Sequence, residues 1–176
     1  LNQNYQEAPV LTKEGRRILM KSVLRAGIGK GLFLRRAPYL WKNLGEMRKK
    51  GRVLPDKLCW RILSDGAPDI EEEYDLAVAY LEGGSAYYVA DHVCAKKKAA
   101  FIHIDYTKAG YTRKLDRDCY LKYDAIFPIG EEVKEQFLKV YPECCGRTKV
   151  FHNIIDPEKI RTKALLPGGF LDNFDG

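Results

Sequence analysis

The stretch YDLAVAYLEGGSAYYVADHVCAKKKAAFIHIDY, residues 74–106, decides the fold class. It opens with an apolar run that ends in paired glycines, Gly83 and Gly84, and this pattern predicts a buried strand followed by a turn. Residues 85–96 then have apolar side chains at helical spacing, and residues 99–104 form a second apolar run. A strand, a helix and a further strand in this order are typical of a parallel sheet.

The same alternation continues toward the C-terminus. Residues 114–122 predict a helix, and residues 124–130 and 148–155 predict a third and a fourth strand. Further helices are predicted over 131–141 and from Pro157 onward. Strands that are apolar on both faces predict an α/β protein with a Rossmann-like, doubly wound parallel sheet covered on both sides. Ligands of such sheets bind beyond the carboxyl ends of the strands, so candidate site residues are sought there.

A basic segment precedes these repeats. The chain of 176 residues has a net charge of +6, but residues 13–52 alone carry 13 Lys and Arg against two acids. We therefore expect residues 1–66 to be a basic, helical and irregular segment of the same domain, residues 67–165 its βα repeats, and residues 166–176 a linker.

Apolar and basic side chains are interleaved in the basic segment, as at Arg35, Arg36, Trp41 and Lys42. An anionic lipid surface would take the apolar side chains into its interface while the cations meet head groups. A nucleic acid would be held by the cations with aromatic rings stacked on its bases, but no nucleic-acid-binding motif accompanies them, so none is expected. The third interpretation is a solvated basic face above an apolar face that packs on the core.

Several kinds of site are not expected. No apolar run reaches ~18 residues, so no membrane-spanning helix is predicted. The five cysteines form no C-x-x-C pair, which indicates reduced thiols in a cytoplasmic protein and no metal site. No Walker motif, G-x-G-x-x-G fingerprint or nucleophile elbow is present.

His103 is the strongest candidate for chemistry, because it stands at the carboxyl end of the second predicted strand and is followed by Asp105. A histidine there can hydrogen-bond a sugar hydroxyl or change charge near neutral pH. The alternative is a buried histidine bonded to a backbone carbonyl. The stretch from Gly83 to Ser85 would open a helix whose amides favour anionic or hydroxyl-rich ligands, or it is a tight turn with a serine cap.

Residues 74–163 resemble the N-terminal half of retaining, GT-B-type glycosyltransferases of the large group 1 (family 4-like) family. The resemblance rests on three phrases in the family's order: YDLAVAYLEGG, KKAAFIHIDY and YDAIFPIGEEVKEQFLKVYPECCGRTKVFHNIIDPEKIRTKA. It implies the acceptor domain of a bacterial enzyme that transfers a hexose from a nucleotide-sugar to a glycan or glycolipid with retention, without a metal or other cofactor.

The resemblance also implies roles for single residues. His103 matches the family's active-site histidine, which contacts the donor sugar. The expected substrate-binding residues are Gly83, Gly84, Asp105 and Tyr106. Asn153 and Asp156 match the turn that precedes the interdomain linker, at the cleft between the two domains.

The resemblance further implies that the family's first strand and glycine-rich loop precede Leu1 and that its donor-binding domain follows Gly176. We therefore expect the nucleotide-sugar to be bound mainly by that second domain, and this polypeptide alone to be inactive. The expected setting is the cytoplasm, with peripheral contact to the inner face of an anionic membrane. The alternative is a non-catalytic doubly wound module that docks on anionic lipid or nucleic acid.

Overall fold

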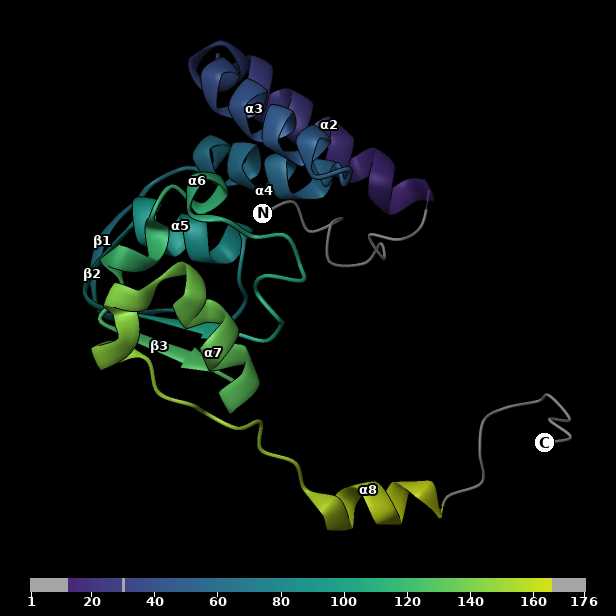
Figure 1. Ribbon diagram of the computed structural model, residues 1–176, viewed down its shortest axis with the longest axis vertical. Coiled ribbons are helices and arrows are strands. Elements are labelled where there is room, and N and C mark those ends of the chain that lie inside the picture. The colour runs from purple at the N-terminus through teal and green to yellow at the C-terminus, as the bar shows by residue number, and fades with distance from the viewer. Residues whose placement is uncertain (1–12, 30, 166–176) are drawn as a thin grey trace, which may run out of the picture.

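The described residues form a parallel three-stranded sheet with helices packed beside it (Figure 1). The computed structural model describes residues 13–29 and 31–165. The sheet has the order β1-β2-β3, with both neighbouring pairs parallel. Its strands are β1 (Ile70–Ala79), β2 (Val93–Ile102) and β3 (Ala125–Pro128). The predicted α/β class and parallel sheet are therefore confirmed.

The first two strands are longer than predicted. Helix α5 (Gly84–His92) ends at His92, and β2 starts directly at Val93 instead of at residue 99. The early part of β2 pairs with the acidic part of β1, where the Lys96 ammonium lies 2.7 Å from the Asp75 carboxylate. Opposite charges on neighbouring strands favour this extended pairing over a longer helix.

Helix α5, which connects β1 to β2, and helix α7 (Glu131–Val140), which follows β3, contribute to the core on one face of the sheet. Tyr87 of α5 and Phe137 of α7 are fully buried in the same hydrophobic cluster as Ile102 of β2. The strands lie in the sheet in the same order as in the sequence. Because the connections between parallel strands are right-handed, two such connections that run in the same direction along the sheet cover the same face.

The other face of the sheet carries a row of aromatic rings. Tyr80 stacks on Phe101 with ring centroids 5.3 Å apart, and Phe101 also meets Phe151 at 5.5 Å. Tyr80 is 67% exposed. The doubly wound prediction places a second set of connecting helices over this face. No such set is found among the residues that the structure describes.

Two further predictions are corrected. Residues 148–155 do not form a full strand: Thr148 makes one bridge to Ile126, and Phe151 donates a backbone hydrogen bond to Pro128 at 2.9 Å. Because β3 has only four residues, it offers little backbone for a neighbour to pair with. The helix predicted after residue 113 is interrupted at Arg117 and Asp118, which have positive φ angles of 52° and 56°.

The interruption separates the short helix α6 (Arg113–Asp116) from the 3-10 helix η1 (Cys119–Lys122). A second 3-10 helix, η2 (Pro142–Arg147), follows α7, and α8 (Pro157–Ala164) lies away from the sheet (Figure 1). The predicted linker, residues 166–176, lies outside the described residues.

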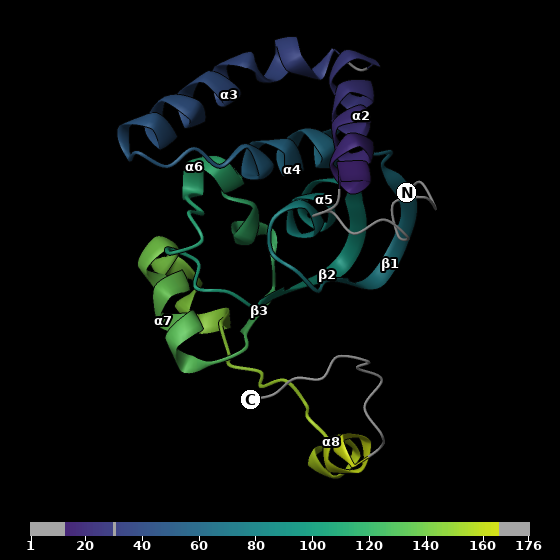
Figure 2. The same cartoon turned by 90° about the vertical axis from the view of Figure 1, so that its right-hand side faces the viewer.

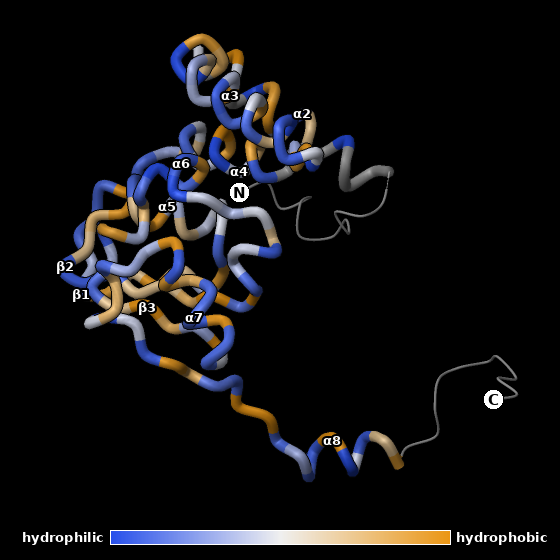
Figure 3. The backbone as a smooth tube through the Cα atoms, in the orientation of Figure 1, coloured by the Kyte–Doolittle hydropathy of each residue, from blue (hydrophilic) through white to orange (hydrophobic). Residues whose placement is uncertain are grey.

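The described part of the basic segment, residues 13–29 and 31–66, is mostly helical. It forms α2 (Lys13–Gly29), α3 (Leu32–Lys49) and α4 (Pro55–Gly66). In Figures 1 and 2, α4 lies between α5 and α3, and α2 packs against α4. Figure 3 shows hydrophobic and hydrophilic residues alternating along α2 and α3, as expected for amphipathic helices.

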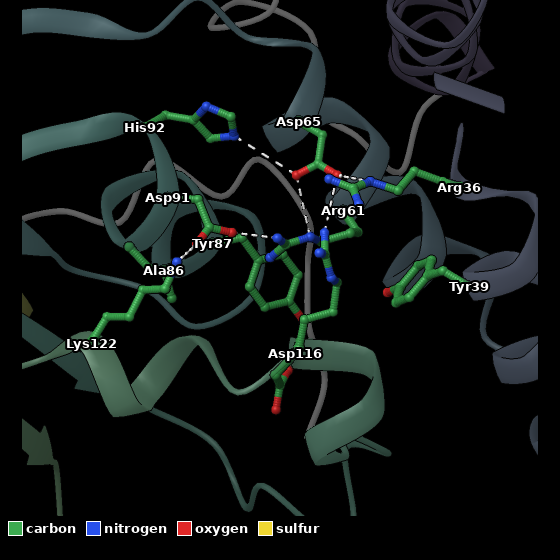
Figure 4. Close-up of polar contacts among 12 residues, drawn as sticks. Arg36, Tyr39, Arg61, Asp65, Ala86, Tyr87, Asp91, His92, Asp116 and Lys122 are labelled. Carbon is green, nitrogen blue, oxygen red and sulfur yellow. Dashed lines mark hydrogen bonds and ion pairs between the residues drawn. The ribbon is translucent and has the colours of Figure 1, made fainter. Parts of the chain in front are cut away.

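A buried ion network fastens α4 to its neighbours (Figure 4). The side chains of Arg61 and Asp65 are each only 3% exposed, and they pair with one another at 3.3 Å. Arg61 also pairs with Asp91 of α5, and Arg36 of α3 reaches Asp65 at 2.6 Å. Buried charges are tolerated when they are paired in this way, so the network sets the position of α4 on the α/β layer.

Candidate functional site

His103 lies directly after β2, at the carboxyl edge of the sheet. Its backbone N–H donates to the Glu82 carboxylate at 3.0 Å, which ties the ends of β1 and β2 together. Its ring nitrogen Nδ1 is buried and has no hydrogen-bond partner among the described residues, so it is not satisfied by a backbone carbonyl there. A buried polar atom without a partner is costly unless a ligand or water supplies one, which makes His103 the centre of the candidate site.

Gly83 and Gly84 lie at the turn between β1 and α5, as predicted. Gly83 has a φ of 79°, and a Cβ added there would lie 2.8 Å from the Tyr111 hydroxyl oxygen. A Cβ on Gly84 would lie 3.1 Å from the ring of Trp60. Both glycines therefore allow two aromatic side chains to approach the backbone, and any contact of these glycines with substrate stays a prediction.

Trp60 and Tyr111 extend the site beyond the residues that the sequence suggested. Trp60 comes from α4, whereas Tyr111 follows β2 and is buried. Lys57, also on α4, places its ammonium 3.2 Å from the Tyr111 hydroxyl and 4.3 Å from the centre of its ring. A cation near the paired glycines makes this end of the sheet favourable for anionic or hydroxyl-rich ligands.

The basic segment thus contributes directly to the site. No spacing or motif in the sequence links α4 to the strand ends. The one available signal was the Arg61–Asp65 pair at helical i, i+4 spacing, and this spacing does not show what α4 packs against.

The Asp105 side chain stabilises the loop that follows β2. Its carboxylate accepts the backbone N–H groups of Thr107 at 3.1 Å and Lys108 at 2.9 Å, and the Lys108 ammonium lies 3.1 Å away. The hydrogen bond from the Lys108 backbone is the main reason that the pKa of Asp105 falls to about 2. The residue is an ionised turn former, and its predicted contact with substrate remains a prediction.

Tyr106 is part of the core. Its side chain is fully buried, and its hydroxyl donates to the carboxylate of Asp116. A ring without exposed surface cannot touch a ligand in this conformation. The prediction of Tyr106 as a substrate-binding residue is therefore corrected: the alternating pattern placed it at a strand end, but the following loop turns it inward.

Asn153 and Asp156 lie on the segment that leads away from the sheet to α8 (Figure 1). Both are exposed. The Asp156 carboxylate accepts the backbone N–H of Lys159 at 3.0 Å and so caps α8. Their predicted place at an interdomain cleft stays a prediction.

The predicted docking residues lie on α3. Trp41 is 79% exposed and Leu34 85% exposed, and Arg35 and Lys42 are exposed beside them. Arg36 differs from these residues, because its guanidinium pairs with the buried Asp65 at 2.6 Å and its side chain is only 22% exposed; its contact with a lipid surface stays a prediction.

None of the described helices combines the length and the apolar character needed to cross a membrane. In residues 13–29 and 31–165, no group of three or more His, Cys, Asp or Glu side chains could hold a metal ion. Comparisons with models of protein families, with curated proteins and with solved structures find no match to this chain.

Proposed function

We propose that this chain is the acceptor-side, Rossmann-like domain of a retaining GT-B-type glycosyltransferase. It would help transfer a hexose from a nucleotide-sugar to a glycan or glycolipid. The observation that carries this proposal is the buried Nδ1 of His103 at the carboxyl end of β2, which has no hydrogen-bond partner within residues 13–29 and 31–165. The resemblance of residues 74–163 to that family supplies the reaction class.

In this proposal His103 binds a hydroxyl group of the donor sugar. Glu82 holds the backbone at His103 through its 3.0 Å hydrogen bond, and therefore sets the height of the imidazole above the sheet edge. Trp60 and Lys57, beside the paired glycines, form the wall against which the acceptor lies. A second domain contributes most of the nucleotide-binding surface, and the leaving phosphate takes the acceptor proton.

The test is an assay of nucleoside diphosphate release from a panel of nucleotide-sugars, with the polypeptide of the complete reading frame and a lipid and glycan extract as acceptor. His103→Ala should lower release with the active donor by about ten- to a hundredfold, as expected for the loss of a hydrogen bond made in the transition state. Cys94→Ala, at an exposed position of the same strand, is the matched control and should leave the rate unchanged. An unchanged rate in His103→Ala would show that the assigned role is wrong.

A second candidate function is docking on an anionic membrane surface, and the exposed face of α3 favours it. Leu34 and Trp41 are seven residues apart and so lie on one side of the helix, with Arg35 and Lys42 adjacent. Such a face places apolar side chains in the lipid interface and cations among the head groups. Docking is compatible with sugar transfer to a lipid-linked acceptor.

Trp41 provides the readout, because the chain has only one other tryptophan. Its emission should shift to shorter wavelength with vesicles of phosphatidylglycerol and phosphatidylcholine, and the shift should weaken with added salt. In vesicle co-sedimentation, which does not depend on the tryptophan signal, Trp41→Ala and the double change Arg35→Glu with Lys42→Glu should abolish binding. Ile154→Ala, which alters an apolar side chain that is 91% exposed elsewhere, should not. Binding to oligonucleotides but not to vesicles would instead favour the nucleic-acid alternative.

A further inference from the structure

A cleft of about 570 Å³ lies beside the candidate site. It is an open cleft lined by the end of α3, the connection that follows α3, the loop after β2 and the last turn of α7. Figure 2 shows the end of α3 on the same side of the molecule as α6 and α7. Met47 and Tyr111, both buried, form part of its wall. This volume is within the range of small-molecule pockets.

The charges that line the cleft are unbalanced. Four of its lining residues are Lys or Arg, and Glu46 is the one acid among the described residues that line it. Glu46 is already bound by the ammonium of Lys114, which lowers its pKa. Arg113 is likewise compensated, because its guanidinium lies 2.8 Å from Asp118 and 2.7 Å from Glu143.

The other three cations, Lys50, Arg52 and Lys139, form no ion pair within the described part of the chain. Arg52 donates to the backbone carbonyl of Lys108 at 2.7 Å, and Lys139 donates to the side-chain amide oxygen of Gln136 at 3.1 Å. These acceptors are neutral, so the positive charges are oriented but not cancelled. Next to an apolar wall such charges attract an anion more strongly than they would in open solvent.

We propose that this cleft binds a small phosphate ester of the size of a sugar phosphate. Lys50, Arg52 and Lys139 meet the phosphate, and Met47 and Tyr111 contact the body of the ligand. A phosphate oxyanion suits several convergent cations because it carries up to two charges and three free acceptor oxygens. The volume leaves room for an organic group that inorganic phosphate lacks.

Tyr111 connects this cleft to the strand-end site, because its hydroxyl approaches Gly83 from the same loop that lines the cleft. A phosphate held in the cleft would therefore lie next to the place proposed for the acceptor. Only the assignment of this ester to the acceptor rests on the proposed function; the binding site itself does not.

The test is calorimetric titration of the chain with glucose 6-phosphate, inorganic phosphate and glucose. No donor sugar or turnover is needed, so this test can succeed or fail independently of the transferase assay. We expect glucose 6-phosphate to bind, inorganic phosphate to bind more weakly, and glucose not to bind. Absence of glucose 6-phosphate binding would overturn the proposal, and equal binding of both phosphates would show that the cleft takes a free anion and no ester.

Variants locate the binding. Arg52→Gln and Lys139→Gln should each weaken glucose 6-phosphate binding by about three- to tenfold, as expected for the loss of one charged contact at a partly exposed site. Both side chains are exposed, so the folded state should be kept, which circular dichroism checks. Lys149→Gln removes the same charge from an exposed position outside the cleft and should not change the affinity. Equal losses in Lys149→Gln and Lys139→Gln would reduce the effect to net charge and refute the site.

Discussion

Replacing Asp116 by Asn should remove a pH dependence of stability that this buried carboxyl group creates. Asp116 is fully buried among tyrosines, and its carboxylate accepts hydroxyl hydrogen bonds from Tyr87 at 2.8 Å, from Tyr141 at 3.2 Å and from Tyr106. Burial raises its pKa from an ordinary value of 3.8 to about 7, against the opposing effect of these hydrogen bonds. Between these two pH values the folded protein binds a proton that the unfolded chain has released.

The size and sign of the effect follow from linkage. A raised pKa in the folded state makes the free energy of unfolding fall as pH rises from about 4 to about 7, by about 1.4 kcal/mol per pH unit where the difference is complete. Over the whole interval this one group accounts for about 4 kcal/mol, which is present below pH 4 and lost above pH 7.

The assay is urea unfolding at several pH values between 4.5 and 8, ~0.5 unit apart, followed by circular dichroism. Other groups titrate in this range, so the quantity to compare is the slope of unfolding free energy against pH in wild type and in Asp116→Asn. Asp118→Asn, which alters an exposed neighbour, is the control and should keep the wild-type slope between pH 5 and 7. Equal slopes in wild type and Asp116→Asn would refute the reasoning.

Two further predictions concern the elements that position the site. Gly83→Ala should lower the free energy of unfolding by about 1–3 kcal/mol, because its φ of 79° and the nearby Tyr111 hydroxyl disfavour a side chain. The control is Gly130→Ala, where no atom lies within 4 Å of the added Cβ. It should leave the free energy of unfolding nearly unchanged in the same denaturation experiment. Arg61→Leu should lower the free energy of unfolding by about 2–3 kcal/mol, since it removes the buried cation that Asp65 and Asp91 share. Asp65 keeps Arg36 as a partner, and Asp91 keeps Lys122. Thermal and urea unfolding would measure this loss. The control Lys96→Leu, which breaks an exposed pair, should change the free energy of unfolding by less than about 1 kcal/mol. Losses of equal size in the two variants would contradict the structural role of the buried network.

The parts of the fold that were predictable have a local cause. Residues 99–102 and 125–128 are apolar runs near turn residues, and they form strands as expected. Residues 13–29, 32–49 and 55–66 of the basic segment are helical. The start of β2 was missed because apolar side chains keep helical spacing as far as Val93. Its extended conformation depends on pairing with the acidic part of β1, where Lys96 meets Asp75.

The candidate site was predictable only in part. His103 and the paired glycines were found because they follow apolar strands, and ligands bind at strand ends in parallel sheets. Trp60, Tyr111 and the lining of the cationic cleft were not found. They are contributed by segments far apart in the sequence, and no local pattern shows which of them meet.

The sequence by itself therefore determined the α/β class, the helical character of the basic segment and the place of His103, because periodicity and strand ends are properties of neighbouring residues. Only the tertiary structure decided that Trp60 covers Gly84 and that Tyr106 turns into the core. It also decided that cations from three separate segments converge on one cleft. These arrangements depend on how helices pack on a sheet, where burial and charge pairing between distant segments outweigh local preference.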